Sequence, residues 1–194
     1  MKKFSWEDTY KKKPHWATGK SSVIDKFFLI AEKFNLKGKV LDIGCGTGEK
    51  TSLIAKKFDT TGIDISKTAI KKAKKKYKNI RFKAENAEKL SFKSNSFDAV
   101  FSNAVLQFTD LRKSAKEIFR ILKPNGIACL SIIVQTISRK KTGKDITNKT
   151  IRAYRKLPFK FLEKDIYNTI DKEPFIHEHK IINLILIKRS KRKG

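Results

Sequence analysis

A glycine-rich turn between an apolar run and a helical pattern is the part of the sequence best suited to bind a ligand. Residues 40–49 read Val-Leu-Asp-Ile-Gly-Cys-Gly-Thr-Gly-Glu, so an aspartate is followed by glycines at alternate positions. Glycine permits positive φ angles and lets the backbone come close to a ligand. The free N–H groups that begin a helix can face that ligand. The pattern predicts a buried strand, a ligand-binding turn and a helix.

A second acidic residue, Asp64, ends the next expected strand, 20 residues after Gly44. A carboxylate at this place can accept hydrogen bonds from both hydroxyls of a ribose, a feature shared by nicotinamide-binding proteins and nucleoside-binding transferases. A dinucleotide fingerprint would also need a third glycine at position 49, which is Glu49. A glutamate there would repel a pyrophosphate but tolerate a ligand that carries an ammonium and a sulfonium group.

Alternating apolar strands and amphipathic helices predict the sheet that would hold these groups at one edge. Strands are expected at 40–43, 60–65, 80–84, 97–101 and 127–134, with helices from Ser21 or Ser22 to about 34 and at 49–58, 67–78 and 110–123. Residues 161–170 are expected to be helical, and 175–179 and 183–187 to pair as an antiparallel edge hairpin. Elements that alternate at this spacing indicate an α/β fold, a parallel, doubly wound sheet between two layers of helices.

A single domain, 1–194, is expected, because this length can bury one full core. Residues 1–20 carry several aromatic side chains among lysines, and we interpret them as an N-terminal lid segment. Residues 135–160 are polar and basic, and we interpret them as a substrate-side segment.

Charge is the most unusual property of the composition, with 46 Lys and Arg against 19 Asp and Glu and a net charge of +27. Only eight of the basic residues are Arg, whereas dedicated phosphate-binding surfaces favour the bidentate Arg side chain. We interpret the lysines mainly as a solvated surface, with an anionic substrate or partner as the alternative. With 39% hydrophobic and 34% charged residues, a soluble globular chain is expected.

A cytoplasmic protein without a metal site is expected. No apolar run approaches the roughly 18 residues of a membrane span, and residues 7–8 are acidic where a signal peptide would be apolar. Cys45 and Cys129 fall in expected core elements and lack metal-ligand spacing. His177 and His179 share one face of an expected strand, with no third ligand nearby.

Five segments, in order, resemble the motifs of class I S-adenosylmethionine-dependent methyltransferases, in particular the methyltransferase type 11-like members. The segments are Asp42–Gly48, Asp64–Ile65, Glu85–Phe92, Ser102–Phe108 and Leu122–Gly126. The third resembles the family's Gly-Asp-Ala-Glu-x-Leu-Pro-Phe loop, and the fifth its Leu-Lys-Pro-Gly-Gly turn. The resemblance implies a Rossmann-like fold and an enzyme that takes a methyl group from S-adenosylmethionine.

The resemblance also implies which residues bind the cofactor. The glycine turn approaches its methionine part, Asp64 accepts from the ribose, and Ile65 lies beside the adenine. Asn86 stands where the family has an Asp that accepts from the adenine amino group, and an amide oxygen can still accept that bond. The expected cofactor-binding residues are Asp42, Gly44, Cys45, Gly46, Gly48, Asp64, Ile65, Asn86, Ala87, Ser102 and Asn103, with Trp16 as a cover.

The sequence leaves the acceptor open. Residues 102–108, 134–135 and 161–186 resemble malonyl-acyl-carrier-protein carboxyl methyltransferases, which implies a carboxylate on an acidic carrier protein. Residues 10–19 are more similar to small methyltransferases that act on thiols or tellurite. Transfer would be an in-line displacement that depends mainly on positioning. A carboxylate or thiolate needs no base, whereas an alcohol or amine would use His15 or Tyr10, the two candidate catalytic residues.

Two other functions compete with a methyltransferase that acts on a small-molecule or carrier-bound acceptor. A nucleic-acid-binding protein or RNA methyltransferase would use the basic residues 135–160 and 188–193, and its binding would weaken steeply with salt. The sequence lacks an Asn-Pro-Pro-Tyr-like tetrapeptide after the strand at 97–101, which disfavours methylation of base amino groups. The third hypothesis is a cofactor-binding protein without turnover. A monomer or weak dimer is expected.

Overall fold

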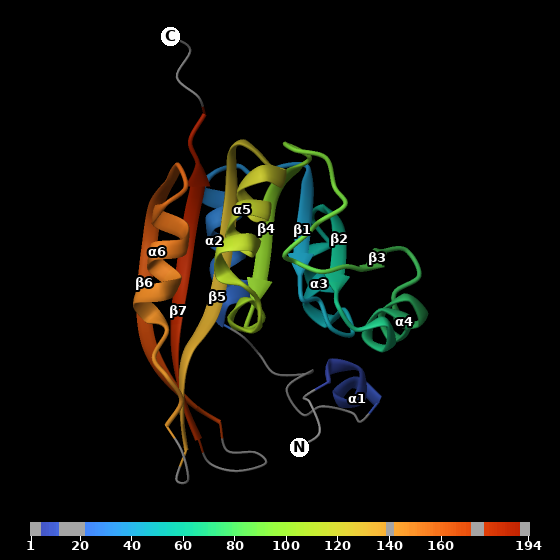
Figure 1. Cartoon of the computed structure of the whole chain (residues 1–194). Helices are drawn as coiled ribbons and strands as arrows, with labels where there is room; N and C mark the ends of the chain where they lie inside the picture. The colour runs from blue at the N-terminus through green and yellow to red at the C-terminus, as the bar shows by residue number, and fades with distance from the viewer. Residues whose placement is uncertain (1–4, 12–21, 139–141, 172–176, 191–194) are drawn as a thin grey trace.

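The computed structural model describes residues 5–11, 22–138, 142–171 and 177–190 (Figure 1). In this part of the chain, seven strands form one mixed sheet in the order β3-β2-β1-β4-β5-β7-β6. Strands β1 to β5 are parallel, whereas β7 runs antiparallel to both β5 and β6. The strands are β1 Lys39–Ile43, β2 Asp59–Asp64, β3 Arg81–Ala84, β4 Phe97–Asn103, β5 Leu122–Ser138, β6 Phe159–Asp171 and β7 His177–Lys188.

Helices cover both faces of this sheet (Figure 1). One face carries α2 (Ser22–Lys33) and α3 (Glu49–Ile54), and the other carries α5 (Leu111–Ile121) and α6 (Thr147–Arg155). Helix α4 (Lys67–Lys76) packs against β2 and β3, and α1 (Trp6–Lys11) contacts α4 beyond the ends of the parallel strands. A 3₁₀ turn, η2 (Leu106–Phe108), follows β4. The predicted doubly wound, three-layer fold with an antiparallel C-terminal edge is confirmed, although the edge hairpin is formed by β6 and β7 and not by the two short strands that were expected.

The parallel strands are buried on both faces, which explains their nearly continuous apolar sequences. In β1, Val40 joins the apolar cluster under α2, whereas its neighbour Leu41 joins the cluster under α5. Both side chains are fully buried. The core therefore fixes the strand ends, and with them the turns that follow. No helix in the described residues is both long and apolar enough to cross a bilayer.

The secondary structure predicted for residues 161–187 was partly wrong. Residues 161–170 lie within strand β6, and the two short strands expected at 175–179 and 183–187 fall in one segment, of which 177–188 is the strand β7. The apolar residues of 161–170 fit a helical period, but from Glu163 onward the side chains alternate between partly buried and exposed. Pairing with β7 along nearly the whole strand outweighs the local helical pattern.

Three further boundaries differ from the prediction. Strand β5 starts directly after α5 and continues to Ser138, and α6 occupies part of the segment expected on the substrate side. Helix α6 packs against α5 and β5 and buries Tyr154 completely. Two apolar side chains, Leu53 of α3 and Phe34 after α2, are 42% and 39% exposed. Helix α3 ends at Ile54, four residues earlier than predicted.

Candidate functional site

A cavity of about 630 Å³ lies at the carboxyl ends of the parallel strands. Residues that end β1, β2 and β4 line it, together with Ile133 of β5, His179 of β7 and two aromatic side chains of α1. In open α/β sheets, ligands bind beyond the carboxyl ends of the strands where the strand order reverses. Here the order reverses between β1 and β4, and the glycine turn follows β1. The cavity thus occupies the place where the sequence predicts the ligand.

The glycine turn is a tight backbone cradle. Gly44, Gly46 and Gly48 have φ angles of 76°, 54° and 90°, a region that side chains strain. A Cβ at Gly44 would overlap the side chain of Val105, and one at Gly46 would lie 2.7 Å from the Tyr10 hydroxyl. Gly48 does not line the cavity; it precedes α3, and a Cβ there would lie 2.8 Å from the Phe82 ring.

Asp42 lies beneath the turn and is almost fully buried. The Thr51 hydroxyl of α3 donates to its Oδ2 over 2.6 Å, which ties the start of the helix to the end of β1. Burial raises the pKa of Asp42 from 3.8 to about 6, although the Thr51 hydrogen bond and the Lys50 charge lower it. Ionised Asp42 would therefore place an uncompensated negative charge next to the cavity.

Asp64 is held in place by the turn itself. The Gly46 N–H donates to its Oδ2 over 3.0 Å, and the Ser66 N–H donates to its Oδ1 over 2.9 Å. Burial raises the pKa of Asp64, against the effect of these two hydrogen bonds. Each carboxylate oxygen has a second lone pair, so both can also accept from a ligand. Ile65, next in the chain, lines the cavity and is 57% exposed.

The loop after β3 supplies Asn86 and Ala87 to the cavity lining. The Asn86 side-chain oxygen accepts a hydrogen bond from the Glu88 N–H over 2.8 Å, which shapes the loop. That oxygen is the atom expected to accept from an adenine amino group, and its second lone pair can still do so. Cys45 also lines the cavity, and burial raises the pKa of its thiol well above the usual value. A buried neutral thiol can line the cavity as a small side chain of the turn.

The segment after β4 gives a mixed result. Asn103 lines the cavity, but Ser102 is fully buried and donates to the Ile43 carbonyl oxygen over 3.0 Å. Ser102 therefore joins β4 to β1 instead of facing a ligand. Gln107 also lines the cavity, and within the described residues both its amide nitrogen and oxygen are covered and lack a hydrogen-bond partner. Gln107 lies inside the segment 102–108, which resembles a family motif, but the sequence predicts only Ser102 and Asn103 of that segment as cofactor-binding residues.

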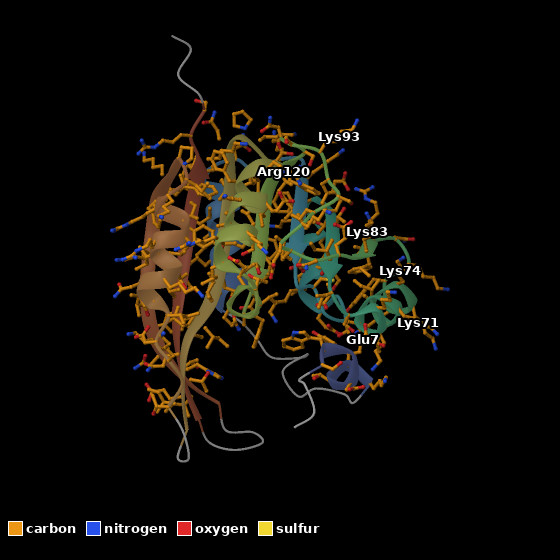
Figure 2. All side chains as sticks on the ribbon, viewed as in Figure 1. Glu7, Lys71, Lys74, Lys83, Lys93 and Arg120 are labelled. Carbon is orange, nitrogen blue, oxygen red and sulfur yellow. The ribbon has the colours of Figure 1, made fainter. Side chains whose placement is uncertain are left out.

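Helix α1 closes the cavity from outside the sheet. Tyr10 is buried over the glycine turn, and the Trp6 ring meets the Phe108 ring edge-on, with centroids 4.9 Å apart. Glu7 accepts hydrogen bonds from the N–H groups of Lys67 and Thr68 at the start of α4. Figure 2 shows Glu7 between the two helices. Of the segment 1–20, which the sequence predicts to be a lid, the structure describes a docked helix over residues 6–11, whereas His15 and Trp16 lie outside the described residues.

Tyr10 is poorly suited to act as a base. Burial, together with the charge of Asp64, raises the pKa of its phenol above the usual value, so the hydroxyl stays neutral. Sequence reasoning did not place Trp6, Phe108 or Ile133 in the site, and it considered His179 only as a metal ligand. No local sequence pattern marks Ile133 or His179 as a cavity residue, because the long-range pairing of β5 with β7 brings them to the cavity.

The charge of the cavity is opposite to that of the whole chain. Its lining includes five carboxylates, whereas Lys50 is the single Lys or Arg among the described lining residues. Other lysines lie outside the lining, and Figure 2 shows Lys71 and Lys74 on α4 and Lys83 on β3. Two of them reach lining carboxylates from outside: Lys83 pairs with Glu85, and Lys76 pairs with Glu49. The carboxylates are those of Asp42, Glu49, Asp64, Glu85 and Glu88. An acidic pocket in a chain of charge +27 favours a cationic ligand.

Known proteins resemble the chain over the part that supplies most of the cavity lining. Residues 41–130 match the model of a family described as a methyltransferase domain. A demethylmenaquinone methyltransferase of Chlorobaculum parvum is 39% identical over 111 residues, 56% of this chain and 45% of that protein. A ubiquinone/menaquinone biosynthesis C-methyltransferase of Rickettsia prowazekii is 35% identical over 111 residues, 50% of this chain and 45% of that protein. The chain spans about half the length of the curated relatives it matches.

A solved structure from Methanosarcina mazei, described as a SAM-dependent methyltransferase, shares the fold. Its TM-score is 0.71 at 22% identity, and the likeness covers 84% of this chain and 98% of that one. At this identity the likeness concerns the fold alone. Residues 41–130 therefore resemble a methyltransferase domain in sequence, and the chain shares its fold with a solved structure described as a SAM-dependent methyltransferase.

Proposed function

We propose that the protein transfers a methyl group from S-adenosylmethionine to a small molecule that binds in the same cavity. The observation that carries this proposal is the acidic lining of the cavity in a strongly basic chain. S-adenosylmethionine has an ammonium and a sulfonium group, both cationic, whereas a dinucleotide would bring a pyrophosphate against these carboxylates. Opposite charges in a partly enclosed site attract strongly, and like charges repel.

The residues of the cavity fit this cofactor. Asp64 would accept from the ribose hydroxyls, and the backbone of Gly44 to Gly46 would lie against the methionine part, where a Cβ would leave no room. The amide of Gln107 supplies a donor and an acceptor that have no partner in the described residues. When bound, the cofactor supplies a methyl carbon activated by its positively charged sulfur. Trp6 and Tyr10 would exclude water from that carbon, which favours direct transfer to the acceptor.

The part of the cavity away from the carboxylates suits an apolar, flat acceptor. Trp6, Val105, Phe108 and Ile133 line it, and Phe108 is 57% exposed. Aromatic side chains pack well against planar rings. Both curated relatives reported above are named for quinone methylation, so demethylated quinols are the first acceptors to test. The acidic lining weighs against a nucleic-acid strand or a carboxylate on an acidic carrier protein, although the basic exterior could still attract either.

Cofactor binding can be tested by isothermal titration with S-adenosylmethionine. The wild-type protein should bind, and Asp64→Ala should weaken binding at least tenfold, because it removes a charged hydrogen-bond acceptor worth about 1.5–3 kcal/mol. Asp59→Ala is the matched control: Asp59 starts the same strand but pairs with Arg81 on the surface. Absence of binding by the wild-type protein would refute the proposal. Equal binding by Asp64→Ala would show that the ribose site is misplaced.

Turnover needs a separate measurement. The protein and cofactor should be incubated with demethylated quinols, simple phenols, thiols, acyl-carrier protein and RNA, and each should be examined for the mass of one added CH₂. Methylation of a ring compound, abolished by Asp64→Ala, is the expected result. Methylation of RNA or carrier protein alone would replace the small-molecule acceptor in this proposal.

A further inference from the structure

The two edges of the sheet are protected to very different degrees. Edge strands expose unpaired N–H and C=O groups, and most proteins protect them by a short strand, by charged side chains or by bulges. Strand β3, at one edge, has four residues, two of which are Arg81 and Lys83. Strand β6, at the other edge, has 13 residues and is the outermost strand on the left of Figure 1. Within the described part of the chain, β6 pairs with β7 alone.

Most of β6 lacks the usual protection of an edge strand. Its pairing with β7 is irregular only between Phe161 and Glu163, and from there the register is continuous to the end of the strand. No proline interrupts this segment, and Lys164 is its single basic residue. The side chains of Ile166 and Ile170 are 44% and 62% exposed, so the helices that cover the sheet leave them open. The outer edge of β6 is therefore long, regular and partly apolar.

The charge of β6 also differs from that of the chain. The strand has two lysines against three acidic residues, whereas the whole chain has a net charge of +27. Two of these acids, Glu163 and Asp165, pair with Lys26 of α2. A nucleic acid or an acidic protein thus meets no excess of positive charge along this strand. A partner that offers its own nearly neutral edge strand is more suitable, and a second copy of β6 is such a strand.

The charges of β6 select the register in which two copies can pair. A two-fold axis perpendicular to the sheet sets the strands antiparallel, with each residue opposite one equally distant from the axis. Successive side chains point to opposite faces, so the axis passes at a residue. An axis at Glu163, Lys164 or Asp165 would set that charge against its own copy, which destabilises the pair. Among the axes that avoid this, the one at Ile166 keeps the longest overlap of the two strands. The opposed pairs are then Ile166 with its own copy, Asp165 with Tyr167, Lys164 with Asn168 and Glu163 with Thr169.

We propose that two copies of the protein pair through β6, antiparallel and centred on Ile166, so that their sheets join into one. Ile166 packs against its own copy, and the backbone groups on the outer edge of β6 find partners. Each copy has a charge of +27, so long-range repulsion opposes the contact. A contact made mainly by two strands is also smaller than a standard interface of about 1,600 Å². The dimer is therefore weak, and salt strengthens it by screening the repulsion.

The first test is sedimentation equilibrium of the full chain at concentrations from about 5 to 500 µM. The average mass should rise with concentration from that of one chain towards that of two, and it should rise further at high salt. Ile166→Lys combined with Ile170→Lys should weaken the dimer about tenfold or more, because the new charges face each other across the axis. Leu29→Lys combined with Leu53→Lys is the matched control. It adds the same charge at apolar side chains of α2 and α3 that are 66% and 42% exposed, and it should leave the dimer nearly unchanged.

A cysteine at the axis tests the register and needs no destabilising charge. Ile166→Cys sets two thiols opposite each other, where the Cβ atoms of paired residues lie about 4.5–5.5 Å apart, close to the span of a disulfide. Cys45 and Cys129 are both buried, so they should not cross-link. Mild oxidation should convert Ile166→Cys to covalent dimers several times faster than Leu29→Cys, which reports random collisions.

Four results would overturn the proposal. The first is the mass of one chain at every concentration. The second is an equal effect of the two lysine pairs, which would place the contact away from β6. The third is equal cross-linking of the two cysteine variants, which would exclude the register centred on Ile166. The fourth is a dimer that weakens at high salt, which would show that opposite charges hold the copies together.

Discussion

Asp42 and Thr51 form a buried hydrogen bond of 2.6 Å that joins the end of β1 to α3 beneath the glycine turn. The bond satisfies the Thr51 hydroxyl, which is also fully buried. It does not compensate for the burial of the carboxylate, whose pKa is raised to about 6. The same acid that would attract the cofactor is therefore unfavourable for the folded protein alone when it is ionised.

Asp42→Asn should stabilise the cofactor-free protein at neutral pH. The folded pKa of about 6 lies above the ordinary value of 3.8, so the unfolded chain loses its proton first as the pH rises. Below about pH 4, Asp42 therefore does not lower the free energy of unfolding. Above that pH its ionisation lowers the free energy of unfolding increasingly until the pH passes 6, by at most about 3 kcal/mol. Asparagine keeps an oxygen that can accept from Thr51. Urea unfolding at intervals from pH 4 to pH 8 should show that the free energy of unfolding of Asp42→Asn exceeds that of the wild-type protein by an amount that grows with pH.

A surface aspartate provides the control for this change. Asp8→Asn removes the same charge from a side chain that is 66% exposed, and it should change stability by less than about 0.5 kcal/mol at every pH. Asp42→Asn should also weaken binding of S-adenosylmethionine. Parallel stability–pH curves for the wild-type protein and Asp42→Asn would contradict the raised pKa.

Gly44→Ala should damage the turn in two separable ways. First, the backbone φ of 76° is strained for alanine, which costs about 1–3 kcal/mol. Second, the alanine Cβ would overlap the side chain of Val105. Val105→Ala removes the two atoms that overlap most closely and should recover part of the loss. A double-mutant cycle of unfolding free energies should therefore give a coupling energy of about 1 kcal/mol between these positions. Additive effects would mean that the backbone alone requires glycine here.

Glu7 should control how firmly α1 covers the cavity. Its carboxylate accepts from two N–H groups at the start of α4, and such an N-terminal acceptor is worth about 1 kcal/mol. Glu7→Ala should speed hydrogen exchange in residues 5–11 and weaken cofactor binding about fivefold. Asp8→Ala is the matched control, because within the described residues the Asp8 carboxylate pairs with Lys11 of the same helix and not with α4. Equal exchange rates in both variants would show that α1 is held by its apolar contacts.

The sequence predicted the parallel half of the molecule well, because its signals are local. Buried strands show continuous apolar runs, and the turn after β1 needs glycines at residues that adopt positive φ angles. The C-terminal hairpin was harder to predict because β6 is an edge strand. Ile166 and Ile170 are 44% and 62% exposed, so its apolar residues do not mark a buried face. The position of His179 follows from that pairing, and no sequence pattern could place it in the cavity.

Gln107 differs from the residues above because its side-chain amide is buried and has no hydrogen-bond partner in the described part of the chain. A covered amide without hydrogen bonds costs about 1–3 kcal/mol, and methionine has a similar shape without that cost. Gln107→Met should therefore leave the free protein as stable as before or about 1 kcal/mol more stable, while it weakens binding of S-adenosylmethionine.

Gln135→Met is the matched control, because Gln135 donates to the Gly143 carbonyl oxygen over 3.1 Å, and its loss should destabilise the protein by about 1 kcal/mol. Urea unfolding and calorimetry on both variants measure the two effects. Equal destabilisation by the two changes would show that Gln107 serves the fold, whereas a stability gain combined with weaker binding would show that its amide is kept for the ligand.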